Sequence, residues 1–167
     1  MARPRRDEPH GAGRPPEGCA LRAGNARDGT ALARVFGAAR SEMRYLPTLH
    51  AYEDHVAYFS GVVLPASQVT VATIDREVVG FSAVKEGWLD HLYVIPAEQG
   101  RGIGGALLDV AMRHNPGGLT LWAFVANHRA IALYGRAGFV EVLRTDGRGN
   151  EEHVPDVQMR WAGSGAA

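Results

Sequence analysis

Apolar residues recur at helical spacing in two segments of the first half of the chain. The first segment begins after Asp28, a residue type that caps helices, and predicts a helix that ends near Tyr45, because Leu46-Pro47 interrupts the pattern. Its inward positions are Ala31, Leu32, Val35, Phe36, Ala39 and Met43. The second segment predicts a helix from about Glu53 to Val62 that is closed by Pro65. Its inward positions are Val56, Phe59 and Val63.

Short runs rich in β-branched and aromatic residues predict four strands in this half. They cover Cys19–Arg22, Val69–Ile74, Val78–Val84 and Trp88–Ile95. The last three are separated only by turns at Asp75-Arg76 and Glu86-Gly87, which are too short for a crossover. These three strands are therefore predicted to run antiparallel.

The second half alternates helices and strands. A helix from Gly102 stops at Asn115-Pro-Gly-Gly118, and a second helix from about His128 to Ala137 is capped by Gly138. The predicted strands are Leu119–Val125, Phe139–Thr145 and Val157–Trp161. Because a helix precedes Leu119, this strand is predicted to run parallel to the strand that begins at Trp88. The predicted order is β-α-α-β-β-β-α-β-α-β-β.

Composition limits the class of protein. The chain has 167 residues, of which 46% are hydrophobic, and this is enough for one domain with a core. Its 18 basic and 18 acidic residues cancel, which disfavours nucleic acid as the main partner. No apolar run is long enough to suggest a membrane partner. The single cysteine, Cys19, excludes an internal disulfide and fits a cytoplasmic location.

The chain ends differ in composition from the rest. Residues 1–18 are rich in Pro, Gly and Arg and poor in large apolar residues, so we expect a disordered tail there. Residues 19–162 form the predicted domain, and residues 163–167 are expected to be disordered.

A glycine-rich bend joins the strand that begins at Trp88 to the helix that follows. Gly100 and Gly102 let an anion approach the backbone closely, and the start of the helix presents unpaired amides at the positive end of its dipole. Such a bend binds phosphate. Read literally, the spacing of Gly100, Gly102 and Gly105 also matches a dinucleotide fingerprint, but no carboxylate occurs about 20 residues later. A purely structural turn is a further alternative.

Two motifs in the expected order resemble those of the Gcn5-related N-acetyltransferase (GNAT) family. The first is Gln99-Gly-Arg-Gly102-Ile-Gly104, and the second is Asn127-His-Arg-Ala-Ile-Ala-Leu-Tyr134-Gly-Arg-Ala-Gly138-Phe139. The resemblance covers most of residues 20–161. It implies an α/β GNAT acyl-CoA N-acyltransferase fold, with a mixed, mostly antiparallel sheet of six to seven strands flanked by about four helices.

The resemblance also implies acetyl-CoA as the acetyl donor. The pyrophosphate is expected on backbone amides of the bend and the pantetheine arm along Leu92 and Val94, whose strand also offers an N–H to the thioester carbonyl. Asn127 is expected to cap its helix and to touch the pantetheine arm. Arg136 either reaches the ribose phosphate or is a solvated arginine. The full set of predicted donor-binding residues is Leu92, Val94, Gln99, Gly100, Arg101, Gly102, Ile103, Gly104, Gly105, Asn127, Tyr134 and Arg136.

Three residues are candidates for the chemistry. Tyr134 matches the family tyrosine that faces the coenzyme sulfur; the alternative is that it only packs against its neighbours. The identity of the general base is left open, because Trp88 stands where the histone-acetylating branch has a glutamate. Asp90 and His91 are the candidates, with a water chain or an already neutral amine as alternatives. Regular alternation would place Asp90 with Leu92 on one strand face and Leu89 with His91 on the other.

The resemblance also implies that the acceptor enters between the Met43–His55 segment and the Asp146–Asp156 loop. Stacking and hydrogen-bonding candidates there are Tyr45, His50 and Tyr52. The acidic residues Glu151, Glu152 and Asp156 either favour a cationic amine or form a solvated acidic loop without this role. The histidines show no metal-ligand spacing, so no metal site is expected.

The predicted activity is transfer of acetyl from acetyl-CoA to a primary amine of a small molecule or peptide, by direct attack in a ternary complex. A non-catalytic acyl-CoA-binding regulatory module and a toxin-type acetyltransferase acting on aminoacyl-tRNA are the alternatives. A homodimer is left open.

Overall fold

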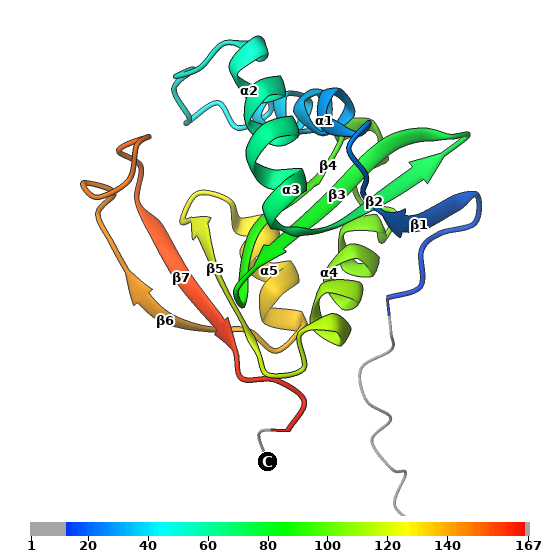
Figure 1. The fold of residues 1–167 in the computed structure, drawn as a ribbon. Helices are drawn as coiled ribbons and strands as arrows, with labels where there is room; N and C mark the ends of the chain where they lie inside the picture. Colours follow the sequence, from blue (N-terminus) through cyan, green and yellow to red (C-terminus); the bar gives the residue numbers. More distant parts are fainter. Residues whose placement is uncertain (1–12, 166–167) are drawn as a thin grey trace, which may run out of the picture.

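A seven-stranded mixed sheet organises the molecule, and the computed structural model describes residues 13–165 of it (Figure 1). The strand order is β1-β2-β3-β4-β5-β7-β6, with β4 and β5 parallel and every other pair antiparallel. The strands are β1 (Cys19–Ala23), β2 (Gln68–Ile74), β3 (Glu77–Lys85), β4 (Trp88–Val94), β5 (Leu119–Phe124), β6 (Val140–Arg144) and β7 (Asp156–Trp161). The predicted element order and the predicted α/β fold are confirmed.

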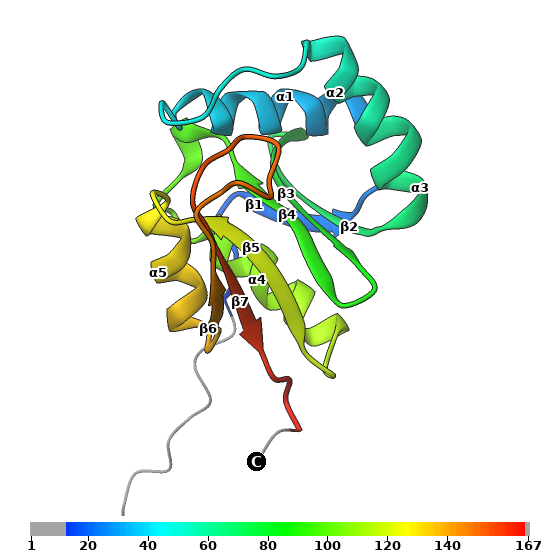
Figure 2. The same ribbon diagram turned by 90° about the vertical axis from the view of Figure 1, so that its left-hand side faces the viewer.

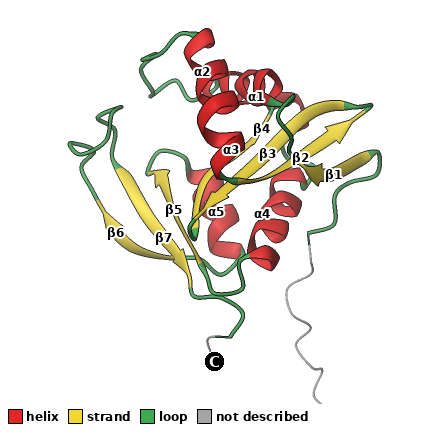
Figure 3. Cartoon of the chain, in the orientation of Figure 1, coloured by secondary structure: helices red, strands yellow, loops and turns green. Residues whose placement is uncertain are grey.

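Helices cover both faces of the sheet (Figures 2 and 3). On one face, α1 (Gly29–Ser41) and a second helical segment pack on β2–β4 through a cluster that includes Leu32, Phe59 and Phe81. The second segment consists of α2 (Tyr52–Tyr58), the π-turn η1 (Phe59–Val63) and α3 (Leu64–Ala66). On the other face, α4 (Ile103–His114) and α5 (His128–Arg136) pack on the sheet through clusters that include Leu107, Leu108 and Tyr134.

The two parallel strands at the centre of the sheet separate soon after they begin. β4 and β5 pair only at Trp88 and Thr120, whereas β5 pairs along its whole length with β7. The carboxyl-terminal ends of β4 and β5 therefore diverge and leave an opening between the two halves of the sheet (Figure 1). The glycine-rich bend, with the single 3₁₀ turn η2 (Pro96–Glu98), follows β4 at this opening.

Three local predictions need correction. The first helix ends at Ser41 and continues as turns, rather than reaching Tyr45. Asp28 occupies the N-cap position of α1, but its carboxylate binds the Arg22 guanidinium and the Asn25 N–H instead of capping the helix. Pro65 lies inside the helical segment, in α3, which continues directly from η1, rather than closing a helix that ends at Val62.

The ends of the chain fall partly outside the described residues. Of the expected disordered tail, residues 1–12 lie outside them, as do residues 166–167 of the C-terminus. The Gly13 backbone lies against Gly105 at the start of α4, and Ser164 donates its N–H to Pro116 C=O (3.0 Å). Across residues 13–165, the helices are too short or too polar to cross a bilayer.

Candidate active site

The bend after β4 presents unpaired backbone donors. Gly100 and Gly102 have φ values of +79° and +90°, a region in which a side chain is strained. The first hydrogen bond of α4 runs from Ala106 N–H to Gly102 C=O (3.0 Å), so the N–H groups of Ile103, Gly104 and Gly105 have no helical acceptor. They lie at the positive end of the α4 dipole, an arrangement that fits a phosphate or diphosphate.

Arg129 on α5 adds a positive charge at this bend. One of its guanidinium nitrogens lies 3.1 Å from where a Cβ on Gly100 would be. The Gln99 side chain fixes this arrangement, because its Oε1 accepts a hydrogen bond from Arg129 (2.9 Å) and its Nε2 donates to Val94 C=O (2.9 Å). Sequence reasoning missed Arg129, although it stands two residues after Asn127 in the second motif.

Arg101, the arginine that was predicted at the bend, instead forms an ion pair with Glu98. The structure therefore brings a cation to the bend from α5 as well as from the bend itself.

A cavity of about 630 Å³ extends from this bend into the opening between β4 and β5. It is lined by ten of the predicted donor-binding residues, which are Leu92, Val94, Gln99, Gly100, Gly102, Gly104, Gly105, Asn127, Tyr134 and Arg136. Arg101 and Ile103 do not line it, and the Ile103 side chain is buried in the core. Ile103 is thus placed to contribute its backbone N–H alone.

The edge of β4 that faces the cavity carries backbone groups of Leu92 and Val94. Ile95 donates its N–H to Val79 on the β3 side (2.9 Å). Because successive residues of a strand direct their N–H and C=O groups to opposite edges, those of Val94 and Leu92 point to the β5 side. Since β5 has diverged there, these groups face the cavity. The Val94 C=O accepts the Gln99 side chain, so the Leu92 backbone and the Val94 N–H are the groups directed at a ligand.

Tyr134 lines the inner part of the cavity from α5, with 7% of its surface exposed. Its ring packs beside Phe139, with centroids 5.7 Å apart. Burial, together with nearby Tyr93, raises the Tyr134 pKa well above its usual value, so the hydroxyl keeps its proton. Asn127 caps α5 as predicted, because its side chain accepts a hydrogen bond from Ala130 N–H (3.2 Å).

A β-bulge at Asp90 interrupts the regular alternation of β4, while His91 stays on the same face as Tyr93. His91 pairs with Ala83 and Leu89 with Val84, which leaves Asp90 as the extra residue of β4. The predicted alternation is therefore wrong at Leu89, which packs with Leu108 on the α4 side instead of sharing a face with His91. Asp90 lies near Tyr58 of α2 and its charge helps to raise the Tyr58 pKa, after burial.

His91 lies within an aromatic cluster that includes Phe59 and Phe81, with ring centroids 5.2 and 6.1 Å from its own. Its Nδ1 is buried without a hydrogen-bond partner, and its Nε2 is 3.4 Å from the Tyr58 hydroxyl. Burial, and then the charge of Arg40, lower the pKa of His91 to about 4. Burial raises the pKa of Asp90. Neither residue lines the cavity that contains Tyr134.

Carboxylates occur in the cavity wall that sequence reasoning did not single out. Glu42, at the C-terminal end of α1, and Glu98 both line it. Glu98 is engaged by Arg101, whereas the exposed Glu42 carboxylate has no hydrogen-bond partner in residues 13–165. Their position follows from the long-range fold, which no local motif encodes.

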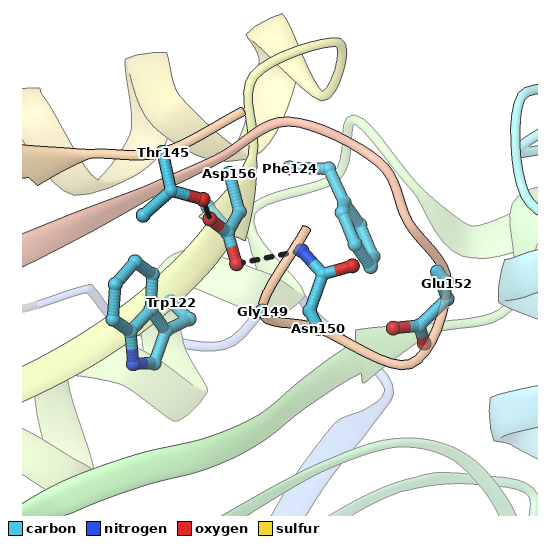
Figure 4. Close-up of a pocket in the computed structure, with 8 residues that line it drawn as sticks. Trp122, Phe124, Thr145, Gly149, Asn150, Glu152 and Asp156 are labelled. Carbon is cyan, nitrogen blue, oxygen red and sulfur yellow. Dashed lines mark hydrogen bonds between the residues drawn. The ribbon is translucent and has the colours of Figure 1, made fainter. Parts of the chain in front are cut away.

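A second cavity, of about 530 Å³, lies under the loop between β6 and β7 (Figure 4). Trp122 and Phe124 of β5 line it together with Thr145, Gly149, Asn150, Glu152 and Asp156. The Asp146–Asp156 loop, beside which the acceptor was expected, contacts the α1 side of the molecule. Arg40 on α1 pairs with Glu152 (2.8 Å), and His50 pairs with Glu151 (2.6 Å).

The acidic residues predicted to attract a cationic amine already have partners within the protein. Glu152 is paired with Arg40 and Glu151 with His50. Asp156 accepts hydrogen bonds from the Thr145 hydroxyl and from Asn150 Nδ2 (2.9 Å). The Arg40 guanidinium offsets the charge of Glu152, whereas Asp156 is held by neutral donors and keeps its charge, so the attraction of a cationic amine stays a prediction. In residues 13–165, three or more His, Cys, Asp or Glu side chains nowhere converge as a metal site would require.

Comparison with known proteins identifies relatives of this arrangement. Residues 65–141 match the sequence model of the acetyltransferase (GNAT) domain family. Peptidyl-lysine N-acetyltransferase YjaB from Salmonella typhimurium is 32% identical over 98 residues, which are 58% of this chain and 67% of that protein.

Solved structures share the fold at lower identity. The apo form of YjaB from Escherichia coli matches with a TM-score of 0.69 and 21% identity, over 87% of this chain and 99% of that one. The structure of yncA, a putative acetyltransferase from Salmonella typhimurium with its cofactor acetyl-CoA, matches with a TM-score of 0.69 and 17% identity, over 89% of this chain and 96% of that one.

Proposed function

Because the chain belongs to the GNAT family of acetyltransferases and is an acetyl-CoA-dependent acyltransferase, we propose that it acetylates a primary amine of a small molecule or peptide by direct attack. The observation that carries the proposal is the continuous cavity that joins the unpaired amides of α4 to Tyr134. A peptidyl lysine, which the curated relative is named for, is the first acceptor to test.

The α4 terminus and Arg129 supply the donor site. The N–H groups of Ile103, Gly104 and Gly105 hydrogen-bond the pyrophosphate of acetyl-CoA, and Arg129 offsets its charge. The free backbone groups of Leu92 and Val94 hold the arm that carries the thioester, as an added strand does at a sheet edge. A β4 N–H directed at the acetyl carbonyl stabilises the negative charge that forms on its oxygen.

Tyr134 meets the leaving group. When the amine nitrogen bonds to the acetyl carbon, the carbon–sulfur bond breaks and its electron pair stays on sulfur as a thiolate. Because the buried Tyr134 hydroxyl keeps its proton, it donates a hydrogen bond to this thiolate rather than transferring the proton outright.

The proton of the amine leaves by a path that avoids direct contact with His91. His91 and Asp90 lie outside the cavity wall, so a proton reaches either of them only through water. An amine that enters already neutral needs no base before it attacks. The proton that its nitrogen then loses goes to the departing thiolate or to water, and this route is compatible with a buried Tyr134 that keeps its own proton. A cytoplasmic location, based on the single Cys19, completes the proposal.

Amine-dependent release of thiol from acetyl-CoA tests this function. The purified protein is incubated with acetyl-CoA and a panel of lysine peptides, amino sugars and small amines, and free thiol and acetylated product are both measured. Product formed in proportion to thiol supports the proposal. Tight binding of acetyl-CoA without product from any amine would favour the regulatory module instead, and acetylation confined to aminoacyl-tRNA would favour the toxin-type activity.

A further inference from the structure

The second cavity has an aromatic floor that the transfer chemistry does not use. Leu121 and Ala123 of β5 are buried on the α5 face of the sheet. Because side chains alternate along a strand, Trp122 and Phe124 project from the opposite face. Trp122 remains 43% exposed although it lies inside the cavity (Figure 4). A large ring left open to solvent within a concave wall is a surface that gains by burial against a ligand.

The polar groups around this floor are already satisfied. The two Asp156 oxygens accept from Thr145 and Asn150, and Asn150 also donates to Val154 C=O (2.7 Å). Glu152 is held by Arg40 at 2.8 Å, with only 16% of its side chain exposed. The Asp156 and Glu152 carboxylates thus already have hydrogen-bond donors within the protein and are largely buried, so a strongly polar group that enters the cavity loses water without a new partner. The accessible chemistry is therefore apolar.

The second cavity adjoins the first. The Phe124 ring lies 6.1 Å from the ring of Tyr45, which lines the cavity that contains Tyr134. The Arg40 guanidinium lies over Phe124, 5.9 Å from the ring centroid, and pairs with Glu152. One acceptor molecule can therefore place its amine in the first cavity and a neighbouring group in the second.

We propose that the second cavity binds an apolar group of the acceptor, next to the arm that carries the amine, with Trp122 as the main contact. This inference rests on the proposed amine acetylation and adds the acceptor's class: an amine flanked by an aromatic or aliphatic group. The preference arises from burial of the apolar group against Trp122 and Phe124, which distinguishes such acceptors from equally long polar ones.

Matched lysine peptides test the proposal. Three peptides differ only beside the lysine, carrying Phe, Ser or Arg, and kcat/KM is measured for each with saturating acetyl-CoA. We expect the Phe peptide to be favoured over the Ser peptide by about tenfold, through KM. Trp122→Ala should remove this preference while leaving the KM for acetyl-CoA unchanged, and Trp122→Phe should retain part of it.

Trp88→Ala is the matched control. Trp88 is 37% exposed on the adjacent strand and lines neither cavity, so its removal should leave the peptide preference intact. Equal kcat/KM for all three peptides, or a preference for the Arg peptide, would overturn the inference while leaving amine acetylation standing. If none of these peptides is acetylated but another amine is, the same comparison is made with apolar and polar derivatives of that amine. Thermal melting of each variant identifies loss of folding.

Discussion

The Tyr134 hydroxyl could transfer a proton to the thiolate or donate a hydrogen bond to it, and its surroundings decide between these two roles. Its ring is 7% exposed and packs beside Phe139, so removing the hydroxyl alone preserves the packing. Burial raises its pKa, which makes the tyrosinate inaccessible and leaves hydrogen-bond donation as its contribution. A donor that strengthens its bond as charge develops on sulfur lowers the barrier without tightening ground-state binding.

Replacing Tyr134 with Phe should therefore lower kcat by about 100-fold and change the KM for acetyl-CoA little, because the lost interaction forms mainly as the thiolate leaves. Steady-state kinetics measure the split, and calorimetry checks that the affinity for acetyl-CoA is retained. A variant with normal kcat would limit Tyr134 to packing.

His91 is expected to couple stability to pH. Its pKa is lowered to about 4 in the folded protein from a reference value near 6.5, so the unfolded chain binds more protons between these values. The part of the stability that is linked to neutral His91 is therefore fully present above pH 6.5 and is lost as pH falls. Between pH 8 and pH 5 the loss attributable to His91 is about 2 kcal/mol.

Urea unfolding at pH 8 and pH 5 measures this difference. His91→Phe, which extends the aromatic cluster of Phe59 and Phe81, should reduce the pH dependence by that amount. An unchanged slope in the variant would mean that other groups carry the acid sensitivity. Because His91 is neutral throughout the range above pH 6, its titration should also be absent from the pH–rate profile there.

At the scale of elements, the end of β4, the bend and α5 act together. Gln99 connects them, because its side chain accepts a hydrogen bond from Arg129 and donates one to Val94.

Arg129→Gln should raise the KM for acetyl-CoA about tenfold, because a charge-assisted contact to phosphate is lost, and should weaken the dependence of this KM on salt. Arg113→Gln on α4 is the control, since that exposed arginine pairs with Asp109 and does not line the cavity. Titration of acetyl-CoA at low and high salt provides the measurement, and equal effects of both variants would contradict the role.

The helices and strands could be predicted from the sequence because each depends on residues that are close together in the chain. Periodicity marked α4 and α5, Pro and Gly marked their ends, and short turns fixed the antiparallel strands. The bulge at Asp90 was not readable, because it depends on the register against Ala83 on the neighbouring strand. The same limit applies to Arg129 and Glu42, whose places in the cavity wall arise from the packing of α5 and α1.

The opening between β4 and β5 divides the molecule as a whole, and the Arg40–Glu152 ion pair is among the contacts that span it on the α1 side. Arg40, near the end of α1, reaches Glu152 in the loop between β6 and β7, 112 residues later in the chain. Both side chains are largely covered, at 21% and 16% exposure, and Arg40 also stacks on Phe36 and Phe124. The pair fixes the loop that roofs the second cavity.

Arg40→Met should release this loop and leave Glu152 largely buried without its partner, at a cost of about 2 kcal/mol in stability. We expect faster amide hydrogen exchange in residues 146–155 and a higher KM for the acceptor, with little change in the KM for acetyl-CoA, whose proposed contacts lie on α4 and α5. Arg144→Met is the control, because Arg144 pairs with Glu141 on the exposed strand β6. Restoration of loop protection in Arg40→Met combined with Glu152→Leu would show that the unpaired carboxylate, rather than lost stacking, loosens the loop. If the single variant left exchange in the loop unchanged, the two halves would be held together by their other contacts, and the acceptor site would not depend on this pair.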